Sequence, residues 1–140
     1  MYKKFLLPTD GTSYSEKEIE RINKIIPDDG ELIILSVAGR LNSSAFQSRR
    51  KVKNLNIRLK KEAELAVENM AAKFESKPNV KKLVETGFPA ETINRVAMEE
   101  DVDLIVLAAS GKSGIHKFIL GSVAEKVLKT SEIDVLLLHN

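Results

Sequence analysis

The residues best suited to chemistry in this sequence lie in a glycine-containing loop between a short apolar run and an amphipathic segment. Nine residues separate Gly111 from Gly121, and Ser122 follows where the amphipathic segment begins. Backbone amides at a helix N-terminus bind phosphate, and glycine lets a phosphate approach the main chain closely. The pattern is typical of a phosphate-binding loop, although a plain loop with Ser122 as the helix cap fits the same residues.

Two better-known phosphate motifs do not account for this loop. Gly111, Lys112 and Ser113 look like the end of a P-loop, but that pattern requires glycine at the position of Val106. A G-x-G-x-x-G dinucleotide fingerprint is also absent from the sequence. Any phosphate site here must therefore be of another kind.

The sequence offers no recognisable catalytic constellation. It contains no cysteine and only two histidines, His116 and His139. A thiol nucleophile is therefore excluded, and a histidine zinc site is not expected. No Ser-His-acid arrangement can be identified, so we expect no catalytic residue and no protein-bound metal.

Composition and charge favour a cytoplasmic protein that is not built for membranes or nucleic acids. The chain has 140 residues, 43% of them hydrophobic, and no apolar run approaches the roughly 18 residues of a membrane span. The absence of cysteine favours a reducing compartment. The net charge is +2. A basic cluster at 49–53 and 60–61 can bind nucleic acid, but a solvated helix start is the favoured explanation, and aromatic residues for base stacking are few.

Short apolar runs alternate with longer amphipathic runs along the chain, which predicts an α/β fold with a parallel sheet and helices on both faces. Strands are expected at 4–7, 32–37, 80–85, 104–108 and 134–138. Helices are expected from 13 or 15 to 26, at 52–74, at 90–100 and from 121 onward. The polar connection 38–48 is expected to be mobile and to lie near the ligand site.

The apolar spacing predicts which side chains of two helices face the core. In the first helix they are Ile19, Ile22, Ile25 and Ile26; in the last they are Val123, Val127 and Leu128.

The segment 104–129 resembles the universal stress protein family, whose ATP-binding members carry G-x-x-G, nine residues, then G-S or G-T. Gly111, Gly121 and Ser122 match this motif, whereas the first glycine position holds Ala108. The resemblance extends over the whole chain, in family order and spacing. Its other matches are Pro8-Thr9-Asp10-Gly11, Val37 at the end of the second strand, Gly87-Phe88-Pro89, and the strand entry at 102–106.

The resemblance implies one domain, 1–140, with a doubly wound, five-stranded parallel sheet of order 3-2-1-4-5, like the adenine nucleotide alpha hydrolases. It implies that Asp10, beside Pro8 and Thr9, contacts adenosine and that Val37 packs near the adenine. Gly111, Gly121 and Ser122 would hold the phosphates. Independently of the resemblance, the charge of Lys112 beside Gly111 suggests a further cation near the phosphates. The implied nucleotide-binding set is Pro8, Thr9, Asp10, Val37, Ala108, Gly111, Lys112, Gly121, Ser122 and Val123.

Three functions remain open at this point. The first is an ATP-binding regulatory protein with magnesium carried by the phosphates, although AMP or another adenine nucleotide could replace ATP. The second is a dimeric interaction module that binds no nucleotide, which the replacement of the first motif glycine by Ala108 favours. The third is a slow ATPase or an autophosphorylating enzyme using Ser122 or a nearby hydroxyl. A homodimer is expected through the apolar last strand, which contains Val135, Leu136, Leu137 and Leu138.

Overall fold

A computed structural model describes the whole chain except residues 10–13, 15, 40–47, 78, 109–120 and 140. Strands and helices alternate along it as the sequence predicts. The elements are β1 (Lys4–Pro8), α1 (Glu16–Ile25), β2 (Glu31–Ala38), α2 (Arg49–Ala72), β3 (Val80–Thr86), α3 (Pro89–Glu99), β4 (Leu104–Ala108), α4 (Ser122–Thr130) and β5 (Asp134–Leu138).

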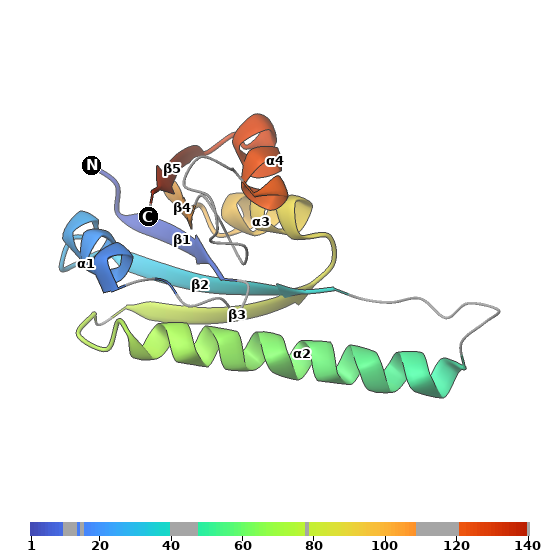
Figure 1. Ribbon diagram of the computed structural model, residues 1–140. Coiled ribbons are helices and arrows are strands. Elements are labelled where there is room, and N and C mark those ends of the chain that lie inside the picture. The colour runs from blue at the N-terminus through green and yellow to red at the C-terminus, as the bar shows by residue number, and fades with distance from the viewer. Residues whose placement is uncertain (10–13, 15, 40–47, 78, 109–120, 140) are drawn as a thin grey trace.

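The sheet has five strands in the order β3-β2-β1-β4-β5, and all neighbouring strands are parallel (Figure 1). This confirms the predicted fold class and strand order. The chain starts in the middle of the sheet, builds outward through β2 to β3, and then crosses to β4 and β5. The direction of winding therefore changes between β1 and β4.

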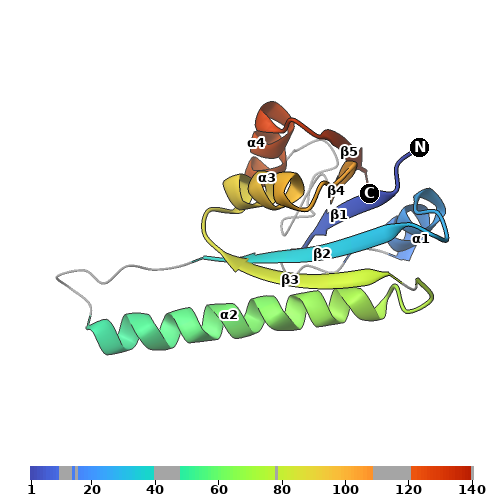
Figure 2. The same ribbon diagram turned by 180° about the vertical axis from the view of Figure 1, so that it is seen from behind.

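Two helices cover each face of the sheet, as Figures 1 and 2 show from opposite sides. Helices α1 and α2 cover one face, and α3 and α4 cover the other. Strand β1 contributes to both layers because successive side chains point to opposite faces. Phe5 and Leu7 pack with α1 and α2, whereas Leu6 packs with α3 and α4.

Local chemistry fixes the ends of two helices. Ser48 caps α2, where the Lys51 amide donates to the Ser48 side-chain oxygen at 3.1 Å. Gly87 precedes α3 with φ of 147°, a conformation that side chains rarely adopt, and Pro89 occupies the first turn.

The end of α3 is closed by two backbone bonds. Asp101 lies just beyond the helix with φ of 52°. Its amide donates to the carbonyl of Met98 at 3.2 Å, and the amide of Val102 donates to the carbonyl of Ala97 at 2.9 Å. These are the bonds of a Schellman motif, which satisfies carbonyls at a helix C-terminus.

The predicted inward face of the last helix is partly wrong. Ala124 and Val127 are the buried residues of α4, whereas Val123 and Leu128 are 37% and 39% exposed. At about 100° per residue, Val123 and Leu128 lie about 140° apart around the helix axis. A buried stripe is only about 100° wide, so it cannot contain both of them together with Val127. The prediction for α1 is confirmed, since Ile22 and Ile26 are buried and Ile19 and Ile25 pack against the same core.

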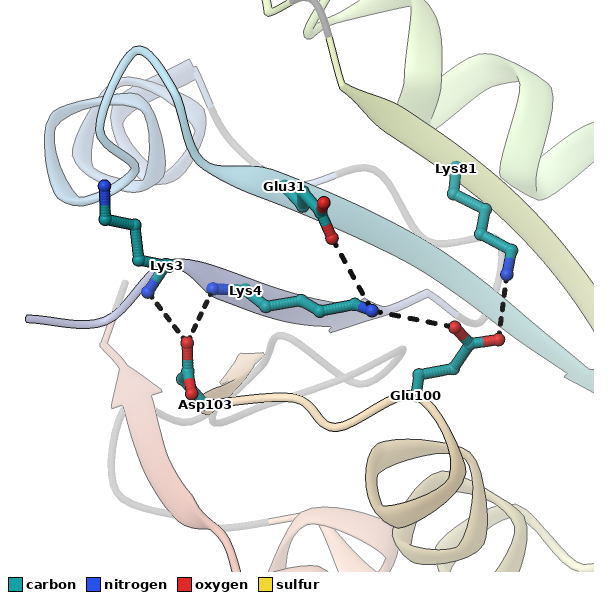
Figure 3. Close-up of polar contacts among 6 residues, drawn as sticks. All are labelled: Lys3, Lys4, Glu31, Lys81, Glu100 and Asp103. Atoms are coloured by element: carbon teal, nitrogen blue, oxygen red, sulfur yellow. Dashed lines mark hydrogen bonds and ion pairs between the residues drawn. The ribbon is translucent and has the colours of Figure 1, made fainter.

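Charged side chains bind the strands together at the amino end of the sheet (Figure 3). The Asp103 carboxylate accepts hydrogen bonds from the amides of Lys3 and Lys4, both at 2.9 Å, and these bonds hold the pKa of Asp103 below its ordinary value. The Lys4 ammonium lies 3.5 Å from Glu31 and 3.9 Å from Glu100. This end of the sheet is thus tied by side chains from β1, β2 and the segment between α3 and β4.

Candidate functional site

The hydrogen-bonded ladder between β1 and β4 ends before either strand does. It pairs Phe5 with Leu104 and Leu6 with Ile105 and goes no further. Beyond that point β1 remains paired with β2 as far as Pro8, and β4 remains paired with β5 as far as Ala108. The two strands therefore stop pairing with each other at their carboxyl ends, where the direction of winding also changes. In open α/β sheets this is where ligands bind.

The carboxyl end of β1 is held by hydrogen bonds to β2 and to the segment before α1. The Thr9 amide donates to the carbonyl of Leu35 at 2.8 Å, and the Tyr14 hydroxyl donates to the carbonyl of Pro8 at 2.8 Å. Thr9 itself is buried, at 6% exposed. Pro8 and Thr9 thus form a fixed support for the residue that follows. That residue, Asp10, lies outside the described part of the chain.

Val37 lies past the end of β1 because β2 is the longer strand. Pro8 pairs with Leu35, so Val37 is two residues further along β2, where its partner among the described residues is Glu85 of β3. Its side chain is half-buried against the core on the α3 and α4 face. This position permits contact with a ligand lying beyond β1, as the resemblance implies.

Ala108 is the last residue of β4 and is half-buried. It pairs with Leu138 in β5. Among the described residues other than glycine, only Asp101 has a positive φ. Ala108 therefore occupies ordinary strand backbone, and this position does not require glycine for conformational reasons.

Helix α4 begins without a side-chain cap. Gly121 is its N-cap residue, with φ of −64° and ψ of 151°, and among the described residues no side-chain hydrogen bond caps the first amides. Ser122 is the first helical residue, so the interpretation of Ser122 as the cap is wrong. Ser122 and Val123 are both exposed. The first turn thus presents uncapped amides beside a serine hydroxyl, as an anion site requires.

The structure describes part of the predicted set and places its strand residues at the carboxyl end of the sheet. Pro8 and Thr9, Val37, and Ala108 lie at the carboxyl ends of the three adjacent strands β1, β2 and β4, and Gly121, Ser122 and Val123 start α4. Asp10, Gly111 and Lys112 lie outside the described residues, as do His116 and the segment 40–47 of the connection expected to be mobile.

Sequence reasoning missed the contribution of Tyr14. Its hydroxyl holds the Pro8 carbonyl, although the residue lies in a polar stretch that reads as a simple helix start. An aromatic residue six positions after the end of a buried strand was the available signal. The ring packs against the core on the α1 and α2 face, which explains why a tyrosine is placed there.

The described residues contain neither a cluster of metal ligands nor a helix suited to crossing a membrane. Within the described residues, no group of three or more histidine, cysteine, aspartate or glutamate side chains could hold a metal ion. None of the helices in that part of the chain has the length and apolar character needed to cross a bilayer.

Comparison with known proteins gives matches over nearly the entire length. The model of the universal stress protein family matches residues 1–139. The universal stress protein MJ0577 of Methanocaldococcus jannaschii is 31% identical, with 97% of this chain and 94% of that protein aligned. Its solved structure superposes with a TM-score of 0.77 at 32% identity, covering 99% of this chain and 96% of that one.

Two further solved structures share the fold and contain nucleotides. A universal stress protein in complex with cAMP has a TM-score of 0.69 at 24% identity and covers 99% of this chain and 97% of its own. A family protein of Arabidopsis thaliana with AMP bound has a TM-score of 0.63 at 17% identity and covers 97% of this chain and 90% of its own. At these identities the likeness extends to the fold alone.

Proposed function

This chain belongs to the universal stress protein family, and we propose that it binds an adenine nucleotide, ATP with magnesium first among them, where β1 and β4 stop pairing. The observation that carries the proposal is the early end of the β1–β4 ladder, after Leu6 and Ile105. It coincides with the point where the strand order reverses and with the predicted ligand residues of both strands.

The phosphates are assigned to the start of α4. Its first amides carry no side-chain cap, and the Ser122 hydroxyl is exposed beside them. Helix amides and their dipole favour a bound anion at this end. Gly111 is proposed to complete the phosphate site, as the family motif implies. Lys112 is proposed, from its charge and position alone, to add a cation near the phosphates, and Val123 contributes its amide. Magnesium would be held by phosphate oxygens and water.

The adenosine is assigned to the ends of β1 and β2. Thr9 and Pro8 are fixed by Leu35 and Tyr14, so they would hold Asp10 in a reproducible position. Val37 offers a half-buried apolar side chain beyond the end of β1. An apolar wall with a few fixed polar groups is the usual composition of such a site.

We propose a regulatory rather than a metabolic use of the nucleotide. No general base or arginine finger is recognisable in the sequence, so hydrolysis should be slow if it occurs. The related folds contain AMP in one case and cAMP in another, which supports testing several adenine nucleotides. The absence of cysteine supports a cytoplasmic location.

The deciding experiment is to denature the purified protein and identify any released nucleotide by chromatography. Titration calorimetry with ATP, AMP and cAMP, each with and without magnesium, then ranks the ligands. Release or binding of an adenine nucleotide supports the proposal. If no nucleotide is released and none gives heat or a thermal shift at millimolar concentration, the dimeric interaction module replaces it. Phosphate release over time tests the slow ATPase.

A further inference from the structure

Helix α2 carries its charges in two separate halves. Residues 49–61 contain seven cations and no anion, whereas residues 62–72 contain three anions and no cation. The cations are Arg49, Arg50, Lys51, Lys53, Arg58, Lys60 and Lys61, and the anions are Glu62, Glu64 and Glu68. The helix dipole favours the opposite arrangement, with anions at the N-terminus and cations at the C-terminus. The stability of this helix alone therefore does not explain the distribution.

The charges at the middle of α2 have no partner within the described part of the chain. Arg58 and Glu62, and likewise Lys60 and Glu64, are four residues apart, yet neither pair forms an ion pair there. Four-residue pairs are weaker when the cation precedes the anion, as it does in both cases. These four side chains remain available to another molecule. Glu68 is different, because it accepts hydrogen bonds from Lys82 at 2.9 and 3.1 Å.

Two exposed apolar side chains lie on the same outer face of the helix. Ile57 is 46% exposed and Leu65 is 62% exposed. At about 100° per residue, Lys61 points directly away from the buried stripe that includes Val52 and Met70, with Ile57 and Leu65 about 40° to either side. Figures 1 and 2 show that this helix forms an outer layer, with the sheet on its inner side only.

We propose that two copies of this chain associate through the outer faces of α2, antiparallel, with a two-fold axis at Lys61. In such a pair, a residue that lies a given number of positions before Lys61 in one copy faces the residue the same number of positions after Lys61 in the other copy. Ile57 then meets Leu65, and Arg58 meets Glu64. Each contact occurs twice, as an isologous interface requires. The basic half of each helix thereby lies against the acidic half of the other.

The arrangement also brings two like charges together, and this repulsion limits the affinity of the two copies for each other. Two Lys61 side chains approach each other at the axis, although their flexible stems allow both ammonium groups to turn toward Glu64 of the opposite copy. One helix face is a small interface, and exposed ion pairs contribute little. The association should therefore be weak and should weaken further between about 0.05 M and about 0.5 M salt.

A partner that is only anionic, such as a nucleic acid or an acidic membrane, fits the same surface less well. It would use the seven cations but would be repelled by Glu62 and Glu64 on the adjoining half of the helix. A second copy uses both halves. The choice between these partners can be tested directly.

Position-specific cross-linking is the primary test, because the chain has no native cysteine. Lys61→Cys places a thiol beside the axis, within the roughly 8–10 Å that separates packed helices. Asn54→Cys is the matched control, because the two copies of that residue would be separated by 14 residue steps, or about 21 Å. A short bis-maleimide should couple Lys61→Cys at least about tenfold faster at low salt. Equal rates, or faster coupling at position 54, would overturn the proposal.

Charge exchange provides an independent second test. Arg58→Glu and Glu64→Arg should each weaken the association through α2, measured as species larger than the dimer expected through β5, by about tenfold, because each replaces two attractions with two repulsions. The double variant, and a mixture of the two single variants, should restore it. Sedimentation measures association, circular dichroism verifies folding, and Lys17→Glu on α1 controls for net charge. If Glu64→Arg strengthens binding to an anionic polymer while self-association is unchanged, the anionic partner is correct instead.

Discussion

Ala108 occupies the position of the first glycine in the family motif, and its conformation predicts the effect of restoring that glycine. It is the last residue of β4 and has no positive φ, so its methyl group costs no backbone strain. The methyl group can therefore affect binding only by crowding a bound nucleotide, which would cost on the order of 1 kcal/mol of binding free energy. Ala108→Gly should leave ATP affinity unchanged or tighten it up to about fivefold by titration calorimetry. Loss of binding in this variant would contradict the assigned site.

Substitution of Gly121, at the proposed phosphate site, should weaken nucleotide binding much more than substitution of Ala108. Its φ of −64° suits any residue, so replacement need not strain the backbone. We expect Gly121→Val to weaken ATP binding by more than about tenfold, because a branched side chain would crowd a phosphate at the helix start. Gly121→Ala is the matched control, because alanine adds one methyl group and no side chain that could cap the first amides. If both variants bind ATP as the natural protein does, the phosphate is bound elsewhere.

Asp103 should make the stability of the fold sensitive to acid. Bonds from the amides of Lys3 and Lys4 lower the pKa of Asp103 in the folded protein. A lowered folded pKa contributes stability that is present above the unfolded value of about 3.9 and is lost as the pH falls through the folded value. Asp103→Asn should therefore lower the melting temperature at pH 7 and reduce its further fall below about pH 4. An unchanged acid dependence would show that these bonds do not favour the charged form.

At the scale of elements, two turn residues should respond in opposite directions. Asp101 ends α3 with φ of 52°, which glycine adopts more easily, so Asp101→Gly should raise the free energy of unfolding by about 0.5–1 kcal/mol. Gly87 has φ of 147°, and an added methyl would lie 2.9 Å from the Thr92 hydroxyl oxygen. Gly87→Ala should therefore cost about 1–3 kcal/mol. Urea unfolding measures both, and effects of the same sign would contradict the backbone argument.

The elements themselves could be predicted because their signals are local. Strand β2 reads as a continuous apolar run, and five of its side chains from Leu32 to Ser36 are indeed buried. The inward face of α4 was predicted only in part: Val127 is buried as expected, but Val123 and Leu128 cannot share one buried stripe with it, and the spacing alone does not show which neighbours of Val127 face inward. Only packing against the sheet and α3 selects Ala124 and Val127, and a short helix has too few turns to average out such ambiguity.

The candidate site was predictable in location but not in geometry. The family motif and the strand order place Thr9 and Ala108 at the carboxyl end of the sheet, on two neighbouring strands. The length of the β1–β4 ladder depends on how two strands distant in sequence pair, so it does not appear in any local pattern. The same holds for Tyr14, whose hydrogen bond to the Pro8 carbonyl depends on how its ring packs against the core.

At the scale of the whole molecule, the amino and carboxyl ends of the sheet differ in the contacts that hold their strands together. The amino end is tied by Asp103, Glu100 and their lysine partners (Figure 3). The carboxyl end has the shortened β1–β4 ladder and the uncapped start of α4. This division would place the proposed ligand residues on strand ends whose opposite ends are held by hydrogen bonds and ion pairs, as in other α/β binding proteins.

The two edges of the sheet also differ, and this difference supports the proposed homodimer. Edge strand β3 exposes Lys81 and Lys82, which form ion pairs with Glu100 and Glu68 at 2.9 Å each and discourage pairing with another strand. Edge strand β5 pairs only with β4 in the described sheet and contains no charge after Asp134. An apolar edge without charged residues invites a second copy.

We therefore expect two copies to associate through β5, and hydrogen exchange can locate the contact without mutation. Raising the protein concentration should slow amide exchange within Val135–Leu138 by at least about tenfold while β3 remains unchanged, because only paired edge amides gain bonds. Sedimentation at micromolar concentration should give a dimer mass, and it should do so equally for Arg58→Glu, whose substitution lies on α2. A monomer mass would refute the homodimer. A dimer with unchanged exchange in β5 would place the contact elsewhere, and protection confined to α2 would leave the antiparallel helix contact as the sole interface.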